Sequence, residues 1–156
     1  AHVVATRDAH VDPGRHFSPD PDYARTWPRH CVVGTGGEEL HPALAGVRLD
    51  AVFDKGAHAA AYSGFEGATA GGEGLADWLR RRGVDELDVV GIATDHCVRA
   101  TALDAARAGF STRVLLDLTA GVAPASTAAT LDELGAAGVR LEGRPVVRAD
   151  RAEPPA

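Results

Sequence analysis

The chain has 156 residues, of which 45% are hydrophobic and 24% are charged, with a formal net charge of −6. That length suits one compact domain with a real core, and the acidic balance argues against a protein that binds the nucleic-acid backbone. Two cysteines do not make a disulfide framework and indicate a reducing cytoplasm, and no apolar run approaches the roughly 18 residues that a membrane helix needs.

Predicted strands and helices alternate along the chain. Runs of apolar and β-branched residues predict strands at 2–6, 49–53, 87–93, 112–118 and 139–142. Apolar residues at helical spacing predict helices at 74–82, 96–108 and 126–136. This alternation favours an α/β fold with a mostly parallel, doubly wound sheet, in three layers with helices on both faces.

Three details of this layout can be compared with the structure. The uninterrupted apolar run at 87–93 is typical of a strand that is covered on both faces. Ser126 or Thr127 is expected near the N-cap of the last helix. Residues 1–142 are expected to form one domain, and residues 143–156 a flexible tail.

Reactive side chains follow three of the predicted strands. They lie at Asp8 to His16, at Lys55 and at Cys97. In parallel sheets, ligands bind beyond the carboxyl ends of the strands, so these separate segments are expected to meet at one edge. The segment 19–42 is long and irregular, and loops of that length are often functional.

Cys97 lies where a strand gives way to a helix. The helix dipole and the unpaired N–H groups there lower a thiol pKa, favour the nucleophilic thiolate and could hold an oxyanion. A buried core cysteine is the alternative. Lys55 is the only lysine in the chain and could stabilise a nearby thiolate or carboxylate, the alternative being a solvated lysine at a strand end. Cys31 is interpreted as structural or incidental.

Asp8, His10, His16 and His30 are the candidate metal ligands. An Asp-x-His pair with further imidazoles suits Zn²⁺, Fe²⁺ or Mn²⁺, and mixed nitrogen and oxygen ligands do not decide among these ions. A polar surface loop that is rich in histidine is the alternative. Aromatic side chains are rare in this sequence, and those at the proposed edge could stack on a planar ring or serve ordinary packing. The candidate substrate-binding residues are Trp27, Tyr62 and His96.

Several long stretches carry a family resemblance. They are VVATRDAHVDPGRHFS, PDYARTWPRHCVVGTGGEELHP, AVFDKGAHAAAYSGFEG and RGVDELDVVGIATDHCVRATALDAARAG, and they cover nearly all of the chain before the tail. In this order they resemble the nicotinamidase/pyrazinamidase branch of the isochorismatase-like cysteine hydrolases. The resemblance implies an amidase of NAD salvage that converts nicotinamide to nicotinate and ammonia through a cysteine thioester, also hydrolyses pyrazinamide, and holds one divalent metal ion.

The resemblance also implies roles for single residues. Cys97 matches the nucleophile, Lys55 the catalytic lysine, and the N–H groups of Ala93 and Cys97 the oxyanion hole, with a cis peptide bond expected at Ile92–Ala93. The residues that match metal ligands are Asp8, His10 and His30, joined in the pyrazinamidase branch by His16. Trp27 and Tyr62 match residues that flank the pyridine ring.

The sequence departs from the family at its start. The family's general-base aspartate lies on an N-terminal strand, in a D-x-Q-x-D-F type motif, whereas the first residues here match the family's second strand. Neither Asp54 nor Asp95 is expected to replace that base. Two alternatives therefore stay open: another hydrolase of the superfamily, acting on a carbamoyl compound or isochorismate, or an inactive truncated remnant. The expected partners are small-molecule substrates, without nucleic acid or membrane, for a monomer or small homo-oligomer.

Overall fold

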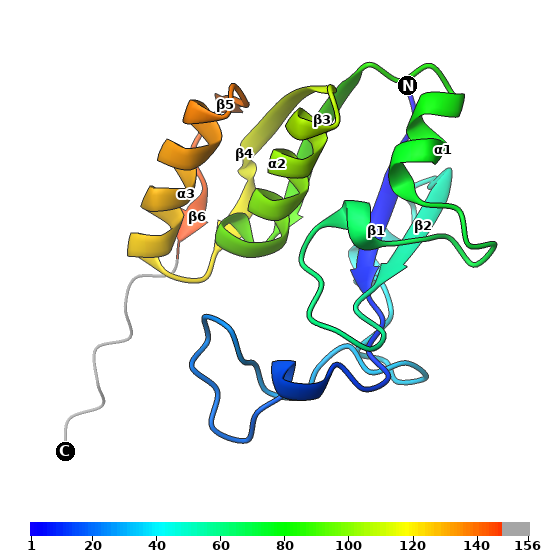
Figure 1. Cartoon of the computed structure of the whole chain (residues 1–156), viewed down its shortest axis with the longest axis vertical. Helices are drawn as coiled ribbons and strands as arrows, with labels where there is room; N and C mark the ends of the chain where they lie inside the picture. Colours follow the sequence, from blue (N-terminus) through cyan, green and yellow to red (C-terminus); the bar gives the residue numbers. More distant parts are fainter. Residues whose placement is uncertain (148–156) are drawn as a thin grey trace. The chain divides into compact units, whose positions relative to one another are not determined.

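The computed structural model describes residues 1–147 and divides the chain into two compact units, Ala1–Trp78 and a second that begins at Leu79 (Figure 1). Every pairing between the strands of its sheets is parallel. The parallel α/β architecture predicted from the alternation of strands and helices is therefore confirmed. No helix in the described part of the chain is long and apolar enough to cross a membrane.

The first unit is built on two adjacent strands. β1 (Val4–Asp8) and β2 (Ala51–Lys55) run parallel, with Val4 opposite Ala51 and Asp8 opposite Lys55. Phe53 of β2 is fully buried and contacts the ring of Trp78 edge-on at 6.1 Å between centroids. Trp78 belongs to α1 (Leu75–Arg81), which thereby covers the β2 side chain. The long connection from β1 to β2 contains only short 3₁₀ turns, as the sequence predicts for its irregular segment.

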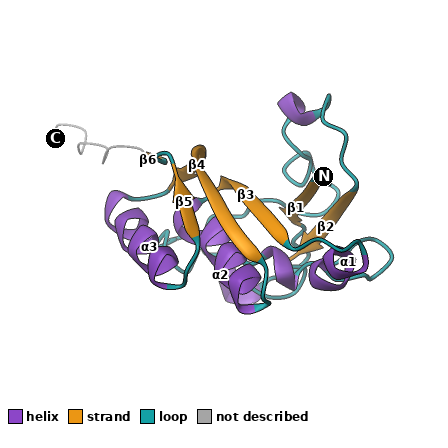
Figure 2. Cartoon of the chain, turned by 90° about the horizontal axis from the view of Figure 1, so that it is seen from above, coloured by secondary structure: helices purple, strands orange, loops and turns teal. Residues whose placement is uncertain are grey.

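The second unit is a four-stranded sheet with two helices. Its strands are β3 (Glu86–Ile92), β4 (Ser111–Gly121), β5 (Arg140–Glu142) and β6 (Val146–Val147), and both β5 and β6 pair with β4. Its helices are α2 (Arg99–Arg107) and α3 (Pro124–Ala136). Both helices lie on the same face of this sheet (Figure 2). The core between helices and sheet consists of Val98, Ala102, Leu103, Val114, Leu116, Leu134 and Val139.

The face of β3 that points away from α2 and α3 differs from the prediction. Exposed and partly buried residues alternate along the strand, and Val90 and Ile92 are 49% and 76% exposed. Successive side chains of a strand point to opposite faces, so within residues 1–147 only one face of β3 is packed against helices. The apolar run at 87–93 correctly predicted a strand, but coverage of both faces is not found in the described part of the chain.

Two predicted boundaries also change. α3 begins at Pro124 with Ala123 as its N-cap, so Ser126 and Thr127 lie inside its first turn. Proline is well suited to the first helical position because its missing N–H has no helical partner there. Residues 143–147 were assigned to the tail, but they include β6, whose backbone pairs with Ala120 and Gly121 of β4. Residues 148–156 of the predicted tail lie outside the described residues.

Candidate active site and metal centre

Asp8 and Lys55 meet at the carboxyl ends of β1 and β2. The parallel register places these two residues side by side. The Lys55 ammonium donates to Asp8 Oδ1 at 2.5 Å and to the Ala61 carbonyl at 2.8 Å, and the lysine is only 4% exposed. A buried ammonium needs such acceptors to compensate for lost water. Lys55 is therefore a buried, paired cation and not the solvated strand-end residue of the alternative interpretation.

Three imidazoles gather directly beyond the end of β1. His10 follows the strand, His16 ends a 3₁₀ turn at Gly14–His16, and His30 comes from the long connection. The ring centroids lie 5.1 Å apart for His10 and His16, 4.9 Å for His10 and His30, and 5.4 Å for His16 and His30. One ring nitrogen from each lies within 4.8 Å of the other two. The alternative interpretation, a polar surface loop that is rich in histidine, is excluded because His10 and His16 are only 0% and 6% exposed.

The hydrogen bonds of two rings fix which nitrogen can bind a cation. His10 Nδ1 lies 2.6 Å from the Gly56 carbonyl, and His30 Nδ1 lies 2.7 Å from the Pro28 carbonyl. A carbonyl oxygen can only accept, so both Nδ1 atoms carry a proton, and in the neutral tautomer the lone pair is on Nε2. Metal-binding histidines typically donate their other ring N–H to such an acceptor. The two rings are thus oriented as ligands.

Two buried ring nitrogens in this cluster lack a hydrogen-bond partner among the described residues. They are His10 Nε2 and His16 Nδ1. Burying an unsatisfied polar atom costs free energy, and native structures seldom leave one without a reason. A divalent cation bound to both nitrogens would satisfy them at once, and borderline ions such as Zn²⁺ or Fe²⁺ prefer imidazole nitrogen. The residues present therefore fit a metal ion.

His16 is held in the form that binds metals. Burial lowers the pKa of its imidazole below the usual value, and the neighbouring rings of His10 and His30 lower it further when they are charged. Asp8 acts in the opposite direction but more weakly. A neutral imidazole is the ligand form. The cluster therefore favours its own metal-competent protonation state.

The carboxylate of Asp8 does not join the three imidazoles in a single set. Its oxygen instead lies within 4.8 Å of donor atoms of His30 and Cys31, so His30 belongs to two groups. All four predicted metal ligands are thus brought to one place in the first unit. Cys31, which the sequence interpretation treated as structural or incidental, lies there too.

Trp27 and Tyr62 lie beside the imidazoles. The Trp27 indole N–H donates to the Tyr62 hydroxyl at 3.0 Å, and the Tyr62 ring lies 5.8 Å from that of His16. Trp27 is positioned by a bridge to Phe17, in which the Trp27 N–H donates to the His16 carbonyl at 2.8 Å. Two predicted substrate-binding residues therefore flank the candidate metal centre in this unit.

Gly56 leaves room for the His10 ring. Its φ is +76°, and a Cβ placed there would lie 2.7 Å from His10 Cε1. We expect Gly56→Ala to cost about 1 to 2 kcal/mol of folding free energy from its left-handed backbone alone and to weaken Zn²⁺ binding roughly 10-fold or more by displacing His10. Isothermal titration calorimetry with Zn²⁺ measures the change in affinity. Gly46→Ala is the control, since that site is open and lacks a positive φ; equal affinities for the two variants would contradict this role.

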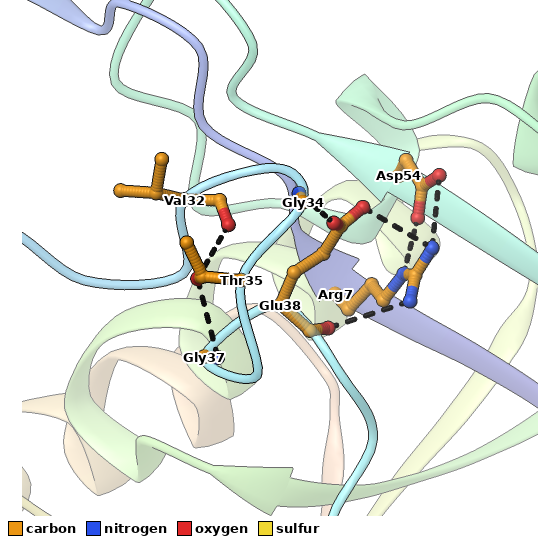
Figure 3. Close-up of polar contacts among 7 residues, drawn as sticks. All are labelled: Arg7, Val32, Gly34, Thr35, Gly37, Glu38 and Asp54. Atoms are coloured by element: carbon orange, nitrogen blue, oxygen red, sulfur yellow. Dashed lines mark hydrogen bonds and ion pairs between the residues drawn. The ribbon is translucent and has the colours of Figure 1, made fainter.

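An ion-pair network holds the loop that follows His30 and Cys31 (Figure 3). Arg7 of β1 donates to Asp54 Oδ1 of β2 at 2.6 Å and contacts the Glu38 carboxylate at 3.4 Å. Glu38 in turn accepts the Gly34 N–H at 2.8 Å. Asp54 is therefore held by Arg7, which agrees with the expectation that it does not serve as a general base.

Cys97 lies in the second unit, within a single π-helical turn (Thr94–Val98) between β3 and α2. The Ile92–Ala93 peptide bond is cis, as the resemblance implied. The Ala93 carbonyl accepts the N–H groups of His96 and Val98, which closes the turn around the thiol. The predicted position at the start of a helix is confirmed, although the first turn is wider than an α-helical one.

The Asp95 side chain connects this turn to the start of α3. Its carboxylate accepts the N–H groups of Val122 and Ala123 at 2.9 and 3.2 Å and the Ser126 hydroxyl at 2.5 Å. Burial by itself would raise the pKa of Asp95, but these hydrogen bonds outweigh it and hold the pKa below its usual value. Asp95 is thus an ionised structural carboxylate, consistent with the expectation that it is not the base. Nearby, burial lowers the pKa of His96.

The chain has parallel strands, a buried imidazole cluster beyond the carboxyl end of one strand, and a thiol at a strand-to-helix junction. This combination is typical of an α/β enzyme. The family model of the isochorismatase domain matches residues 1–143. The chain belongs to the isochorismatase family.

Curated relatives cover most of the chain. The nicotinamidase/pyrazinamidase of Mycobacterium tuberculosis is 61% identical over 140 residues, which are 90% of this chain and 75% of that protein. The nicotinamidase of Escherichia coli is 41% identical over 120 residues, which are 74% of this chain and 56% of that protein. The chain thus spans three quarters of the first relative's length and little more than half of the second's.

Solved structures agree with the fold. A crystal structure of pyrazinamidase of Pyrococcus horikoshii in complex with zinc matches with a TM-score of 0.73 and 37% identity, over 90% of this chain and 74% of that one. PnC1 from L. infantum in complex with nicotinate matches with a TM-score of 0.78 and 37% identity, over 94% of this chain and 75% of that one.

Proposed function

We propose that the protein is a metal-dependent amidase that hydrolyses nicotinamide to nicotinate and ammonia, and pyrazinamide likewise. The observation that carries the proposal is the buried imidazole cluster beside Trp27 and Tyr62, whose His10 Nε2 and His16 Nδ1 have no hydrogen-bond partner within residues 1–147. The 61% identity to the Mycobacterium tuberculosis nicotinamidase/pyrazinamidase supports the substrate class. Cytosolic thiols are kept reduced, which suits a cysteine nucleophile, so we place the reaction in the cytoplasm. Its substrate assigns it to NAD salvage.

His10, His16, His30 and Asp8 would hold one divalent ion. When bound, such an ion supplies a Lewis acid that can hold the pyridine nitrogen of the substrate or polarise a water molecule. The zinc complex of the Pyrococcus horikoshii relative makes Zn²⁺ the first ion to test, with Fe²⁺ and Mn²⁺ next. Trp27 and Tyr62 would bracket the aromatic ring of the substrate, with their shared hydrogen bond fixing the two side chains relative to each other. His96 is a further proposed substrate contact.

Cys97 would supply the nucleophile. The thiol gives up its proton, the thiolate attacks the amide carbon, the carbon–nitrogen bond breaks, and the departing nitrogen gains one proton in exchange and leaves as ammonia. Water then cleaves the thioester, releasing nicotinate and restoring the thiol. The N–H groups of Ala93 and Cys97 would stabilise the oxyanion that forms in both steps. Lys55 would contribute positive charge while holding the Asp8 carboxylate in place.

The test is ammonia release by the chain as it is, loaded with Zn²⁺, with benzamide as the matched substrate. Benzamide has the same amide but lacks the pyridine nitrogen. We expect turnover of nicotinamide and pyrazinamide, and a rate on benzamide lower by at least about 10-fold, because a site built to bind a ring nitrogen discriminates against its loss. A folded, metal-loaded chain that releases no ammonia from any pyridine or pyrazine amide would reject the proposal and favour the inactive remnant.

A further inference from the structure

Cys31 occupies a constrained position beside the imidazole cluster. Its φ of +47° lies in the left-handed region, which non-glycine residues seldom adopt. Its carbonyl accepts the His10 N–H at 2.9 Å, and the His10 carbonyl accepts the Val33 N–H at 2.9 Å. These two bonds form a short parallel bridge between His10 and Val32. The backbone of Cys31 is therefore fixed by the same contacts that fix His10, and the strain is compatible with a local functional requirement.

The Cys31 side chain belongs to a donor group of its own. Its Sγ, one ring nitrogen of His30 and one carboxylate oxygen of Asp8 all lie within 4.8 Å of one another. Around a tetrahedral ion with bond lengths of about 2.0 to 2.3 Å, donor atoms lie roughly 3.3 to 3.8 Å apart. Lys55 donates to Oδ1 of Asp8, and a carboxylate has a second oxygen to offer. Small side-chain movements would thus close this group around an ion.

We propose that Asp8, His30 and Cys31 form a second cation-binding set that takes thiophilic divalent ions, Cd²⁺ above all. This inference deepens the metal binding proposed above and rests on it. The imidazole set offers nitrogen and suits borderline ions, whereas the second set adds a soft sulfur. His30 belongs to both sets, and Asp8 also belongs to the four-ligand site proposed above, so the two sets exclude each other. The chain binds one ion, and the softness of that ion decides whether Cys31 becomes a ligand.

The experiment is a Cd²⁺ titration of the whole chain, in which the ultraviolet charge-transfer absorption of a cadmium–thiolate bond is recorded. The sequence contains only two cysteines, so Cys31→Ser and Cys97→Ser form a matched pair. We expect the band to grow to one equivalent of Cd²⁺ in the unchanged protein and in Cys97→Ser, and to be missing in Cys31→Ser. Cys31→Ser should also bind Cd²⁺ roughly 10-fold or more weakly, while its Mn²⁺ affinity stays within about 3-fold, because Mn²⁺ prefers nitrogen and oxygen.

Two results would overturn the inference. One is a band that survives in Cys31→Ser and disappears in Cys97→Ser, which would place cadmium on the other thiol. The other is the absence of a thiolate band in the unchanged protein at saturating Cd²⁺. The proposed amidase function is tested separately, as ammonia release with Zn²⁺. A cadmium–Cys31 band without turnover would support this inference and reject the amidase function. Turnover without the band would support the amidase function and reject this inference.

Discussion

Replacing Cys97 with alanine is expected to lower the rate of ammonia release from nicotinamide by at least about 10³-fold, because no thiolate remains to form the thioester. Binding of Zn²⁺ should be unchanged, since the three imidazoles and Asp8 belong to the first unit. The measurement is a steady-state ammonia assay together with metal content and circular dichroism. Together they separate loss of the nucleophile from loss of the fold.

The matched control for Cys97→Ala is Arg107→Ala. Arg107 lies at the end of α2, the helix that continues from the Cys97 turn, and its exposed side chain pairs with Asp104 of the same helix. We expect turnover close to that of the unchanged chain. Substantial activity in Cys97→Ala, with Arg107→Ala also active, would show that another group forms the covalent intermediate or that water attacks directly.

The second large effect is expected at Asp95. In the unchanged protein, the Asp95 carboxylate accepts the N–H groups of Val122 and Ala123 and the Ser126 hydroxyl. Asp95→Asn keeps the shape of the side chain but removes the negative charge and replaces one of the accepting oxygens with an NH₂ group. Loss of charge-assisted, buried hydrogen bonds should reduce the free energy of unfolding by about 1 to 3 kcal/mol. Urea denaturation at neutral pH measures this. Asp104→Asn is the control, because its pair with Arg107 is largely exposed and should contribute no more than about 0.5 kcal/mol.

The pH dependence of this difference has a defined sign. The pKa of Asp95 is lower in the folded chain than its usual value, so its stabilising contribution is complete above the unfolded pKa, near roughly pH 4, and is lost as the pH falls through the folded pKa. The stability gap between the unchanged protein and Asp95→Asn should therefore be constant from neutral pH down to about 4 and narrow below that. A gap that widens on acidification would contradict the assignment of Asp95 as an ionised hydrogen-bond acceptor.

Much of the candidate site was predictable from local sequence. Asp8 and Lys55 end predicted strands, and parallel strands deliver their carboxyl ends to one side, so their meeting follows from connectivity. Cys97 follows an apolar run and precedes apolar residues at helical spacing, which places it at a junction in any α/β fold. His10 and His16 share one short loop, in which Asp12 and Gly14 make the turn.

The sequence by itself determined the alternation of strands and helices, the parallel sheet and the segments that bear reactive groups, because periodicity and connectivity are local properties of a chain. Only the tertiary structure decided that Cys31 lies beside Asp8 and His30, that the Gly56 and Pro28 carbonyls set the ring protons, that Ser126 binds Asp95, and that residues 146–147 pair with β4. Most of these contacts join residues tens of positions apart. No local pattern encodes them: they exist because burial forces distant polar groups to find partners.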